Sequence, residues 1–445
     1  MATAPAKLSH LPVDILLYLL LFCELADNVS FSMVCPIFYK LSQQRGYWIN
    51  ALQEARIVRP IACPLQEDLT KHDHQSLKRI ALHTLRLDYN WSLPQPKIKG
   101  PIKAVILGVP PLDVVFQVPG TELYVLHSRS SGNISAWDIG LGKQVSPDIY
   151  ISRRLMDVSP GQDEPGKFSI GILAILAPSV HELWVICLEY GSGGVNLQVT
   201  LQYTLEPDML HWAVFMTTEF IGVLQYNPNE WDDTRCPVDI IALNVSSGTK
   251  TTITTDIPRN MVAEHGYESG AFVLAEESPG VRFIRTEGTL TTGDFYGVPA
   301  VSLRLASLSF LDIPEELEVD PVGPGRFQIQ AIFWTRPEQD DNNNPLVPYH
   351  NINIPGSLQD SPDSSWLLMA LPHSGRKVLI VIQFGSEIRL QLVHFHPHKG
   401  DISVQQIELP PFIDIEQVHG LSLDDHRGVI TLLDTRGVLY ALPYA

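Results

Sequence analysis

The sequence predicts an α + all-β chain, in which a small three-helix unit and a linker helix precede a large domain built of strands. Two stretches before residue 92 carry apolar side chains at helical spacing, whereas from about residue 102 short apolar runs alternate with turn residues. A length of 445 residues accommodates one small domain and one large repetitive domain. We therefore expect a flexible lead at 1–10, a helical domain at 11–55, a helical linker at 56–101 and the β-domain at 102–445.

The first stretch contains an unbroken apolar run, Ile15–Cys23, between the carboxylates of Asp14 and Glu24. A helix that is apolar all round needs burial on every side, and a unit of about forty residues covers one side of it at most. The run is shorter than the about 20 apolar residues that cross a bilayer, which argues against a membrane span. A secretory signal peptide is the alternative, because the run follows Lys7 and has a suitable length.

Two further helices are expected between residues 27 and 52. Asp27 is a candidate N-cap for the first of them, and Pro36 should kink or restart it. The apolar positions of this helix recur at helical spacing, and they are Met33, Val34, Ile37, Phe38 and Leu41. Gly46 then begins a third short helix that carries Trp48 and Leu52.

Together these residues resemble an F-box. The matching positions follow the family's order and spacing, and they are Leu11-Pro12, Leu16, Leu19, Leu25, Val34-Cys35, Phe38, Leu41 and Trp48. The family usually has a basic or polar residue after the Cys, where this chain has Pro36. The resemblance spans residues 11–52, and it implies a three-helix unit that docks on the Skp-type adaptor subunit of an SCF-type, cullin-based ubiquitin ligase.

We expect the adaptor subunit to bind apolar side chains of this unit, each of which contributes about 1.5–3 kcal/mol when it becomes fully buried. The expected docking residues are Leu11, Pro12, Ile15, Leu16, Leu19, Val34, Cys35, Phe38 and Trp48. The alternative is that Leu16, Val34, Phe38 and Trp48 form the core of a small helical bundle that docks on nothing.

The linker is expected to contain one amphipathic helix. Its apolar stripe has helical spacing and consists of Leu77, Ile80, Ala81, Thr84 and Leu85. The Pro- and Gly-rich run Asn90–Pro101 ends this helix and marks the boundary with the β-domain. Since the stripe must pack on the third helix or on the β-domain, we expect the linker to fix the angle between the two parts.

The clearest unit of the β-domain resembles one blade of a WD-repeat propeller. A strand-like run, Glu122–His127, is followed by a Ser/Gly turn, by Asn133–Asp138, which ends in Trp-Asp, and by a Gly-Lys turn. Fainter copies occur at 238–250 and 428–442. At about 40–50 residues per four-stranded blade, residues 102–445 fit seven or eight blades. We therefore expect a degenerate β-propeller, and the alternative is a β-sandwich pair or a propeller with irregular blades.

Further strand candidates lie between these units. They are Leu183–Leu188, Phe220–Gln225, Gly270–Leu274, Val281–Arg285, Val301–Leu305, Gln328–Trp334, Val378–Phe384 and Ile388–Phe395. Residues 336–365 interrupt the pattern, because they contain QDDNNNP, several prolines and few apolar side chains. A long exposed loop is expected there.

Charge and cysteine content restrict the classes of function. The formal charge is −18 and uneven, because residues 1–100 hold 11 Lys and Arg against 8 Asp and Glu, while the remainder holds 20 against 41. The excess of negative charge after residue 100 would repel the phosphate backbone of a nucleic acid. This argues against nucleic-acid binding by the β-domain. Five scattered cysteines without paired or metal-like spacing indicate free thiols in a reducing compartment. We expect a cytoplasmic or nuclear protein that binds no membrane.

No residue pattern indicates a catalytic site, a metal site or a cofactor. His394, His396 and His398 alternate, as residues on one face of a strand do, but a proline and a Lys-Gly turn interrupt that strand. Gly191–Gly194 is a Gly-rich turn without the Lys-Ser/Thr pair of a P-loop, and no Ser lies in a strand–turn–helix elbow. We therefore expect no catalytic residue, no metal ligand and no cofactor, and no enzyme activity in the chain itself.

These observations favour a substrate adaptor of an SCF-type ubiquitin ligase. The F-box-like segment would bind the Skp-type adaptor subunit and through it a cullin, and the β-domain would bind a target protein that the sequence does not identify. One alternative is a propeller-type scaffold outside any ligase, with the helices as a cap on the β-domain. The other is a secreted enzyme with a propeller-borne site, such as a glycosidase or lyase.

Overall fold

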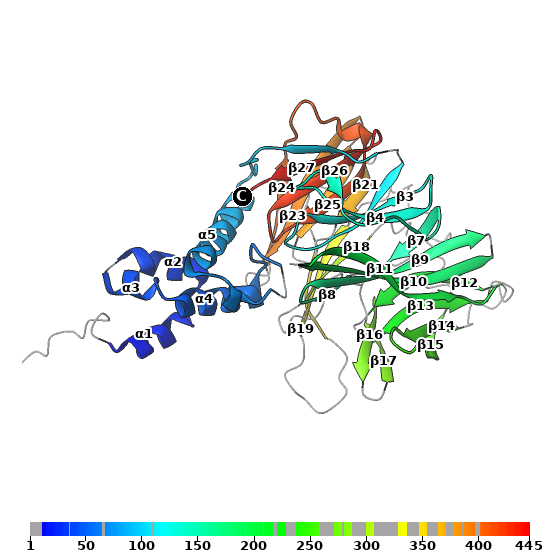
Figure 1. Cartoon of the computed structure of the whole chain (residues 1–445), viewed down its shortest axis with the longest axis horizontal. Helices are drawn as coiled ribbons and strands as arrows, with labels where there is room; N and C mark the ends of the chain where they lie inside the picture. The colour runs from blue at the N-terminus through cyan, green and yellow to red at the C-terminus, as the bar shows by residue number, and fades with distance from the viewer. Residues whose placement is uncertain are drawn as a thin grey trace, which may run out of the picture.

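The chain folds into a helical N-terminal part and a large β-domain, joined by one long helix (Figure 1). The computed structural model describes residues 11–34, 36–64, 67–108, 111–159, 161–177, 179–191, 193–207, 209–216, 220–227, 237–258, 271–277, 280–286, 300–306, 328–335, 347–353, 364–370, 377–384, 386–396 and 401–445. The predicted order, with few helices followed by an all-β region of several sheets, is confirmed.

The helices are α1 (Val13–Leu20), α2 (Leu25–Val34), α3 (Pro36–Leu41), α4 (Arg45–Val58) and α5 (His74–Trp91), with a 3-10 turn, η2 (Leu69–Lys71), before the last. α3 begins at Pro36, so the predicted restart of the helix at this proline is confirmed. α2 begins at Leu25, and the prediction that Asp27 caps it is therefore wrong. Asp27 lies in the first turn of α2, where a carboxylate interacts favourably with the helix dipole.

The described strands form seven antiparallel sheets, which we number as blades 1 to 7 along the chain. Blades 1 to 3 contain β2 (Leu112–Gln117), β3 (Leu123–Ser128), β4 (Asn133–Asp138), β5 (Lys143–Gln144) and β6 (Ile149–Tyr150); β7 (Arg154–Val158), β8 (Gln162–Glu164), β9 (Lys167–Ala177), β10 (Val180–Gly191) and β11 (Gly194–Thr204); and β12 (Leu210–Met216), β13 (Phe220–Tyr226), β14 (Pro237–Asn244) and β15 (Lys250–Pro258).

Blades 4 to 7 contain β16 (Ala271–Glu277) and β17 (Gly280–Thr286); β18 (Ala300–Ala306), β19 (Gln328–Thr335) and β20 (Val347–Asn353); β21 (Ser364–Ala370), β22 (Lys377–Phe384), β23 (Glu387–His396) and β24 (Asp401–Ile407); and β25 (Val418–Asp424), β26 (Val429–Asp434) and β27 (Val438–Pro443) with β1 (Lys103–Ile106). Each of the proposed strand candidates overlaps one of these strands. β20 lies inside the segment 336–365, where the sequence predicted a loop, so that prediction differs from the structure at this strand.

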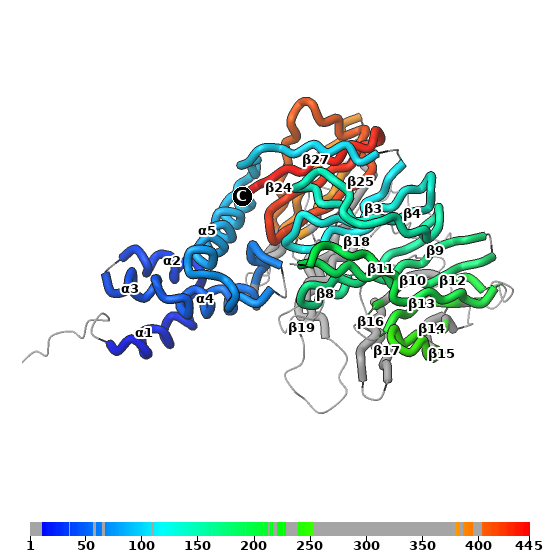
Figure 2. The backbone as a smooth tube through the Cα atoms, viewed as in Figure 1, coloured from blue at the N-terminus to red at the C-terminus, as the bar shows by residue number. Residues whose placement is uncertain are grey.

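Blade 7 joins the two ends of the β-domain. Its strand order is β1-β27-β26-β25, and β1 pairs with β27 from Lys103↔Ala441 to Ile106↔Val438. In Figure 2 the cyan chain that follows α5 runs beside the red β27. The first strand of the domain thus completes its last sheet, and β25 contacts strands of blades 1 and 6 on either side. This arrangement is a β-propeller of seven blades in the described residues.

α5 is buried at its two ends in two different cores. Leu77 and Ala81 belong to the core of the helical part, whereas Leu87 and Trp91 belong to the core that blades 6 and 7 share. The ammonium group of Lys377 in blade 6 lies 4.7 Å from the centroid of the Trp91 ring. The prediction that the apolar stripe of the linker helix packs on the third helix is therefore confirmed, because Leu77 and Ala81 share a core with α4. The contacts with the β-domain come from Leu87 and Trp91, which lie outside that stripe.

Polar contacts add to this attachment. The Asn90 side chain donates to the carbonyl oxygen of Tyr444 at 2.6 Å, which fixes the C-terminus of the chain beside α5 (Figure 1). In the turn between β25 and β26, a ring nitrogen of His426 lies 3.0 Å from the carbonyl oxygen of Ile61. In the same turn Gly428 has φ +70°, and a Cβ there would lie 2.2 Å from a methyl carbon of Leu87. Both the positive φ and the close approach to α5 therefore require glycine at this position.

Replacement of Trp91 by Ala should lower the free energy of unfolding by about 3–5 kcal/mol, because it opens a cavity between α5 and the propeller. Tyr89→Ala is the matched control, since Tyr89 is 70% exposed on the same helix and should change the free energy by less than about 0.5 kcal/mol. Urea unfolding curves measure both. Equal stability of the two variants would contradict the shared core.

Candidate docking surface

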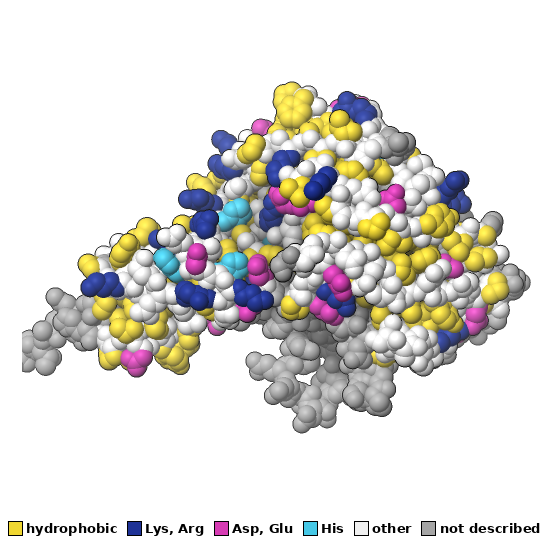
Figure 3. Space-filling view, viewed as in Figure 1, with side chains coloured by type: hydrophobic (Ala, Val, Ile, Leu, Met, Phe, Trp, Pro, Cys, Tyr) yellow, Lys and Arg dark blue, Asp and Glu magenta, His cyan; other side chains and the backbone are white. Residues whose placement is uncertain are grey.

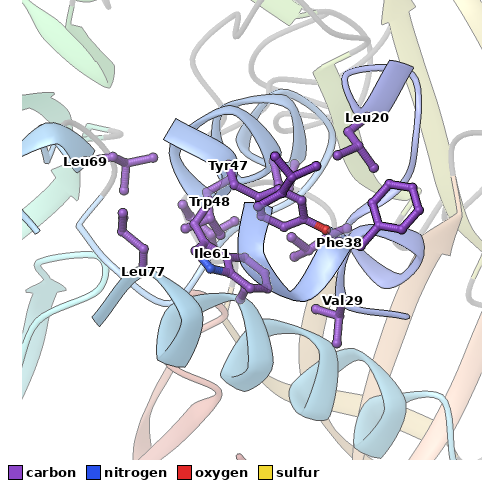
Figure 4. Close-up of a cluster of buried hydrophobic side chains, with 14 of the residues drawn as sticks. Leu20, Val29, Phe38, Tyr47, Trp48, Ile61, Leu69 and Leu77 are labelled. Carbon is purple, nitrogen blue, oxygen red and sulfur yellow. The ribbon is translucent and has the colours of Figure 1, made fainter. Parts of the chain in front are cut away.

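The helical part is built around its own apolar core, shown in Figure 4. Trp48 of α4 is fully buried, and its indole nitrogen donates to the carbonyl oxygen of Ser42 at 2.7 Å. The Tyr47 ring lies edge-on to Trp48, with 5.0 Å between the ring centroids. The other fully or nearly fully buried side chains of this core are Leu16, Leu20, Leu25, Val29, Phe38, Leu41, Ala51, Leu52, Ala55, Ile61, Cys63, Leu69, Leu77 and Ala81.

One buried polar residue, Asn28, ties the first two helices together. Its side-chain amide nitrogen lies 3.3 Å from the carbonyl oxygen of Leu20, 3.1 Å from that of Cys23 and 3.2 Å from that of Glu24. Leu20 ends α1 and Glu24 directly precedes α2, so this one side chain joins the two helices. The Tyr47 hydroxyl donates to the backbone carbonyl of Asn28, so α4 is joined to the same point.

The opposite side of α1 and the end of α2 leave large apolar side chains uncovered. Eight of the sixteen exposed large hydrophobic residues in the described chain lie between residues 13 and 39. We call them the apolar surface, and they are Val13, Ile15, Tyr18, Leu19, Phe22, Met33, Val34 and Tyr39. Phe22, Met33 and Val34 are 74%, 75% and 72% exposed. In Figure 3 hydrophobic side chains gather on this end of the molecule. Exposed apolar side chains that gather in one region are typical of interaction sites.

The expected docking residues divide into two groups. Ile15, Leu19 and Val34 lie on the apolar surface, and Pro12, at the N-cap of α1, is also exposed. Leu11 is half-buried and packs against the core. Cys35 lies outside the described residues.

Leu16, Phe38 and Trp48 form the second group, with 1%, 5% and 0% exposure. Their expected role as direct contacts is corrected, because a side chain that the chain itself buries has no surface left for a partner. For these three residues the alternative interpretation, a core of the helical bundle, describes their position. These three side chains lie in the core that the helices of the apolar surface pack on.

Five residues of the apolar surface were not among the expected ones, and they are Val13, Tyr18, Phe22, Met33 and Tyr39. Tyr18 and Phe22 lie inside the apolar run of α1, where every position is apolar and the sequence therefore does not mark one face. Their rings meet edge-on at 5.2 Å between centroids.

Two titratable side chains near this surface, Tyr47 and Cys23, keep their protons around pH 7. Burial raises the pKa of the Tyr47 hydroxyl to about 12, and burial and the nearby Asp27 raise the pKa of the Cys23 thiol. Neither group therefore loses its proton between about pH 5 and 8. Binding of apolar groups here would not depend on the ionisation of these two side chains.

Among the described residues, no three His, Cys, Asp or Glu side chains lie close enough together to hold a metal ion. His394 lies on β23, while His398 is outside the described residues. A buried histidine pair, His181 and His211, has its Nδ1 atoms 2.9 Å apart, and the second ring also contacts Gln225. In the described part of the chain no helix is both long and apolar enough to span a membrane.

A family model for the F-box domain matches residues 8–50, which include α1, α2, α3 and the start of α4. The chain contains an F-box domain. The apolar surface and the core beneath it thus belong largely to this F-box. The search of curated proteins returns no match.

Over 72–84% of its length, the chain is also similar to solved structures. The β-propeller domain of Cps50 (Swd1) from Myceliophteria thermophila is 12% identical, and the alignment covers 72% of this chain and 93% of that domain at a TM-score of 0.38. The WD40 domain of SCAP from fission yeast is 8% identical over 73% of this chain and 82% of that one, at a TM-score of 0.35. TolB from Acinetobacter baumannii is 13% identical, and the alignment covers 84% of this chain and 74% of TolB at a TM-score of 0.27.

Core and surface positions of the F-box should respond differently to truncation. Phe38→Ala removes a buried ring and should lower the free energy of unfolding by about 3–5 kcal/mol. Ile15→Ala, at a position with 43% exposure in the free chain, should cost less than about 1 kcal/mol. Thermal or urea unfolding of the purified chain measures both. A larger loss for Ile15→Ala than for Phe38→Ala would contradict the assignment of core and surface.

Proposed function

We propose that this chain is the substrate adaptor of an SCF-type ubiquitin ligase. Its F-box would dock on a Skp-type adaptor subunit and through it on a cullin, while the propeller would bind a target protein. The observation that carries the proposal is the apolar surface, which lies largely within the F-box match and has no covering element in the described chain. Docking would bury these side chains, at about 1.5–3 kcal/mol for each one fully covered.

The position of the propeller supports a role in target binding. Its contacts with the segment between α4 and η2 come from two turns at the same end of the blades. One is the β25–β26 turn with His426, and the other is the β2–β3 turn, where Gly120 lies against Cys63 and Pro64. Since consecutive turns of an antiparallel sheet alternate between its two ends, the β26–β27 turn and the loop 408–417 lie at the other end. This end is clear of the F-box, and it exposes 61% of Phe412.

Catalysis would then belong to the assembled ligase, and the chain would work by holding the target at a fixed distance and angle from the adaptor subunit. The buried ends of α5 give the physical basis, because a linker that belongs to both cores leaves little freedom between them. Such an adaptor would act in the cytoplasm or nucleus. A propeller scaffold outside any ligase is the competing function, and it requires that no Skp-type subunit binds.

Co-purification with a Skp-type adaptor subunit tests the proposal. The variant Ile15→Asp/Val34→Asp places two carboxylates on the apolar surface, and both positions are exposed, so the fold should persist. Loss of two buried apolar contacts, at about 3 kcal/mol or more in total, should weaken binding by more than about a hundredfold.

The matched control is Ile106→Asp/Leu141→Asp, which introduces the same two charges at exposed apolar positions of the propeller. We expect this variant to bind like the wild type. Wild-type chain that never binds the adaptor subunit, or equal binding by both double variants, would overturn the proposal.

A further inference from the structure

A basic stripe follows the linker helix and the segment behind it. Residues 71–103 hold seven Lys and Arg against two Asp, in a chain whose formal charge is −18. We define the basic stripe as the exposed or half-exposed cations of α5 and of the segment between α5 and β1, and they are Lys78, Arg79, Arg86, Lys97 and Lys99. Figure 3 shows Lys and Arg side chains gathered along α5 and this segment.

The fold fixes the backbone that carries these cations. Arg79 and Arg86 are seven residues apart and therefore share one face of α5, opposite the buried Leu77 and Ala81. The exposed ring of Tyr89 lies three residues further along the same side.

The segment behind the helix is fixed by backbone contacts. The side chain of Asn90 bonds both the amide and the carbonyl of Lys97, at 3.0 and 2.7 Å. The amide of Lys99 donates to the carbonyl oxygen of Pro443 at 2.9 Å, which anchors the segment to β27. The backbone of the stripe is thus preformed, and a ligand would have to order only the side chains.

The stripe has few counterions of its own. None of its five cations forms a salt bridge with a described residue. Of the two carboxylates of the segment, Asp88 pairs with Arg59 at 2.6 Å. Asp73 accepts from the amide of Ser76 as the cap of α5, and Arg79 is near enough to help lower its pKa. Unpaired like charges on one face create a local positive potential that attracts an acidic partner.

We propose that the basic stripe binds a short acidic segment of a partner protein. From Arg79 to the end of α5 the helix rises about 18 Å, and an extended peptide of about ten residues reaches about 33 Å, enough to continue over the lysines behind the helix. Tyr89 would give such a segment one apolar contact. A long polyanion such as nucleic acid fits less well, because beyond residue 100 the chain holds 41 Asp and Glu against 20 Lys and Arg and would repel it. This inference does not depend on the ligase assignment.

The test uses the full chain and a labelled oligo-glutamate peptide of about ten residues, titrated at low and at physiological salt. The stripe variant is Arg79→Gln/Arg86→Gln/Lys99→Gln. The matched control, Lys143→Gln/Arg153→Gln/Arg154→Gln, removes the same three charges from exposed positions of blades 1 and 2. We expect the stripe variant to bind the peptide at least about tenfold more weakly and the control to change by less than about twofold.

Three results would overturn the proposal. The first is no binding of the peptide at low salt, and the second is equal weakening in both variants, which would show a response to net charge alone. The third is tighter binding of a single-stranded oligonucleotide of equal length with the same loss in the stripe variant, which would assign the stripe to nucleic acid. Adaptor co-purification by the stripe variant should stay at the wild-type level in every case, which separates this test from that of the proposed function.

Discussion

The burial of α5 in two cores is the interaction on which the rest of the structure depends. The first turns of the helix complete the F-box core through Leu77 and Ala81, and its last turns enter the propeller through Leu87 and Trp91. A flexible linker would let the two parts move independently, but a helix whose ends are both desolvated has to be pulled out of one core before the angle changes. The distance between the apolar surface and the free end of the propeller is therefore a property of the fold.

The apolar surface follows from the small size of the helical part. α1 has one charged side chain, Asp14, and it buries Leu16 and Leu20 in the core of the helical part. Nothing in the described chain covers Phe22 or Val34, and under the proposed function the adaptor subunit would bury them. Under the proposed function the same layout separates the roles of the two parts, because the F-box exposes an apolar surface and the propeller supplies a second surface at a fixed position.

The sequence predicted the local features better than the long-range ones. The patterns that the sequence shows each extend over a few residues, as do the helical spacing, Pro36 and the Trp137-Asp138 unit. They were sufficient to predict the helices and most strands. Which side of α1 is buried could not be predicted, because an all-apolar helix carries no periodic signal. Asn28 as a link between helices, and the pairing of β1 with β27, join positions that no local pattern connects.

The central claim is that the chain docks through the apolar surface of its F-box while the propeller stays free for a target. Hydrogen–deuterium exchange of the full chain, with and without a saturating Skp-type adaptor subunit, tests it most directly. The account predicts slower exchange in α1, α2 and α3 on binding, with no change in the seven blades. Slower exchange in the blades with α1 to α3 unchanged, or no change anywhere, would contradict it.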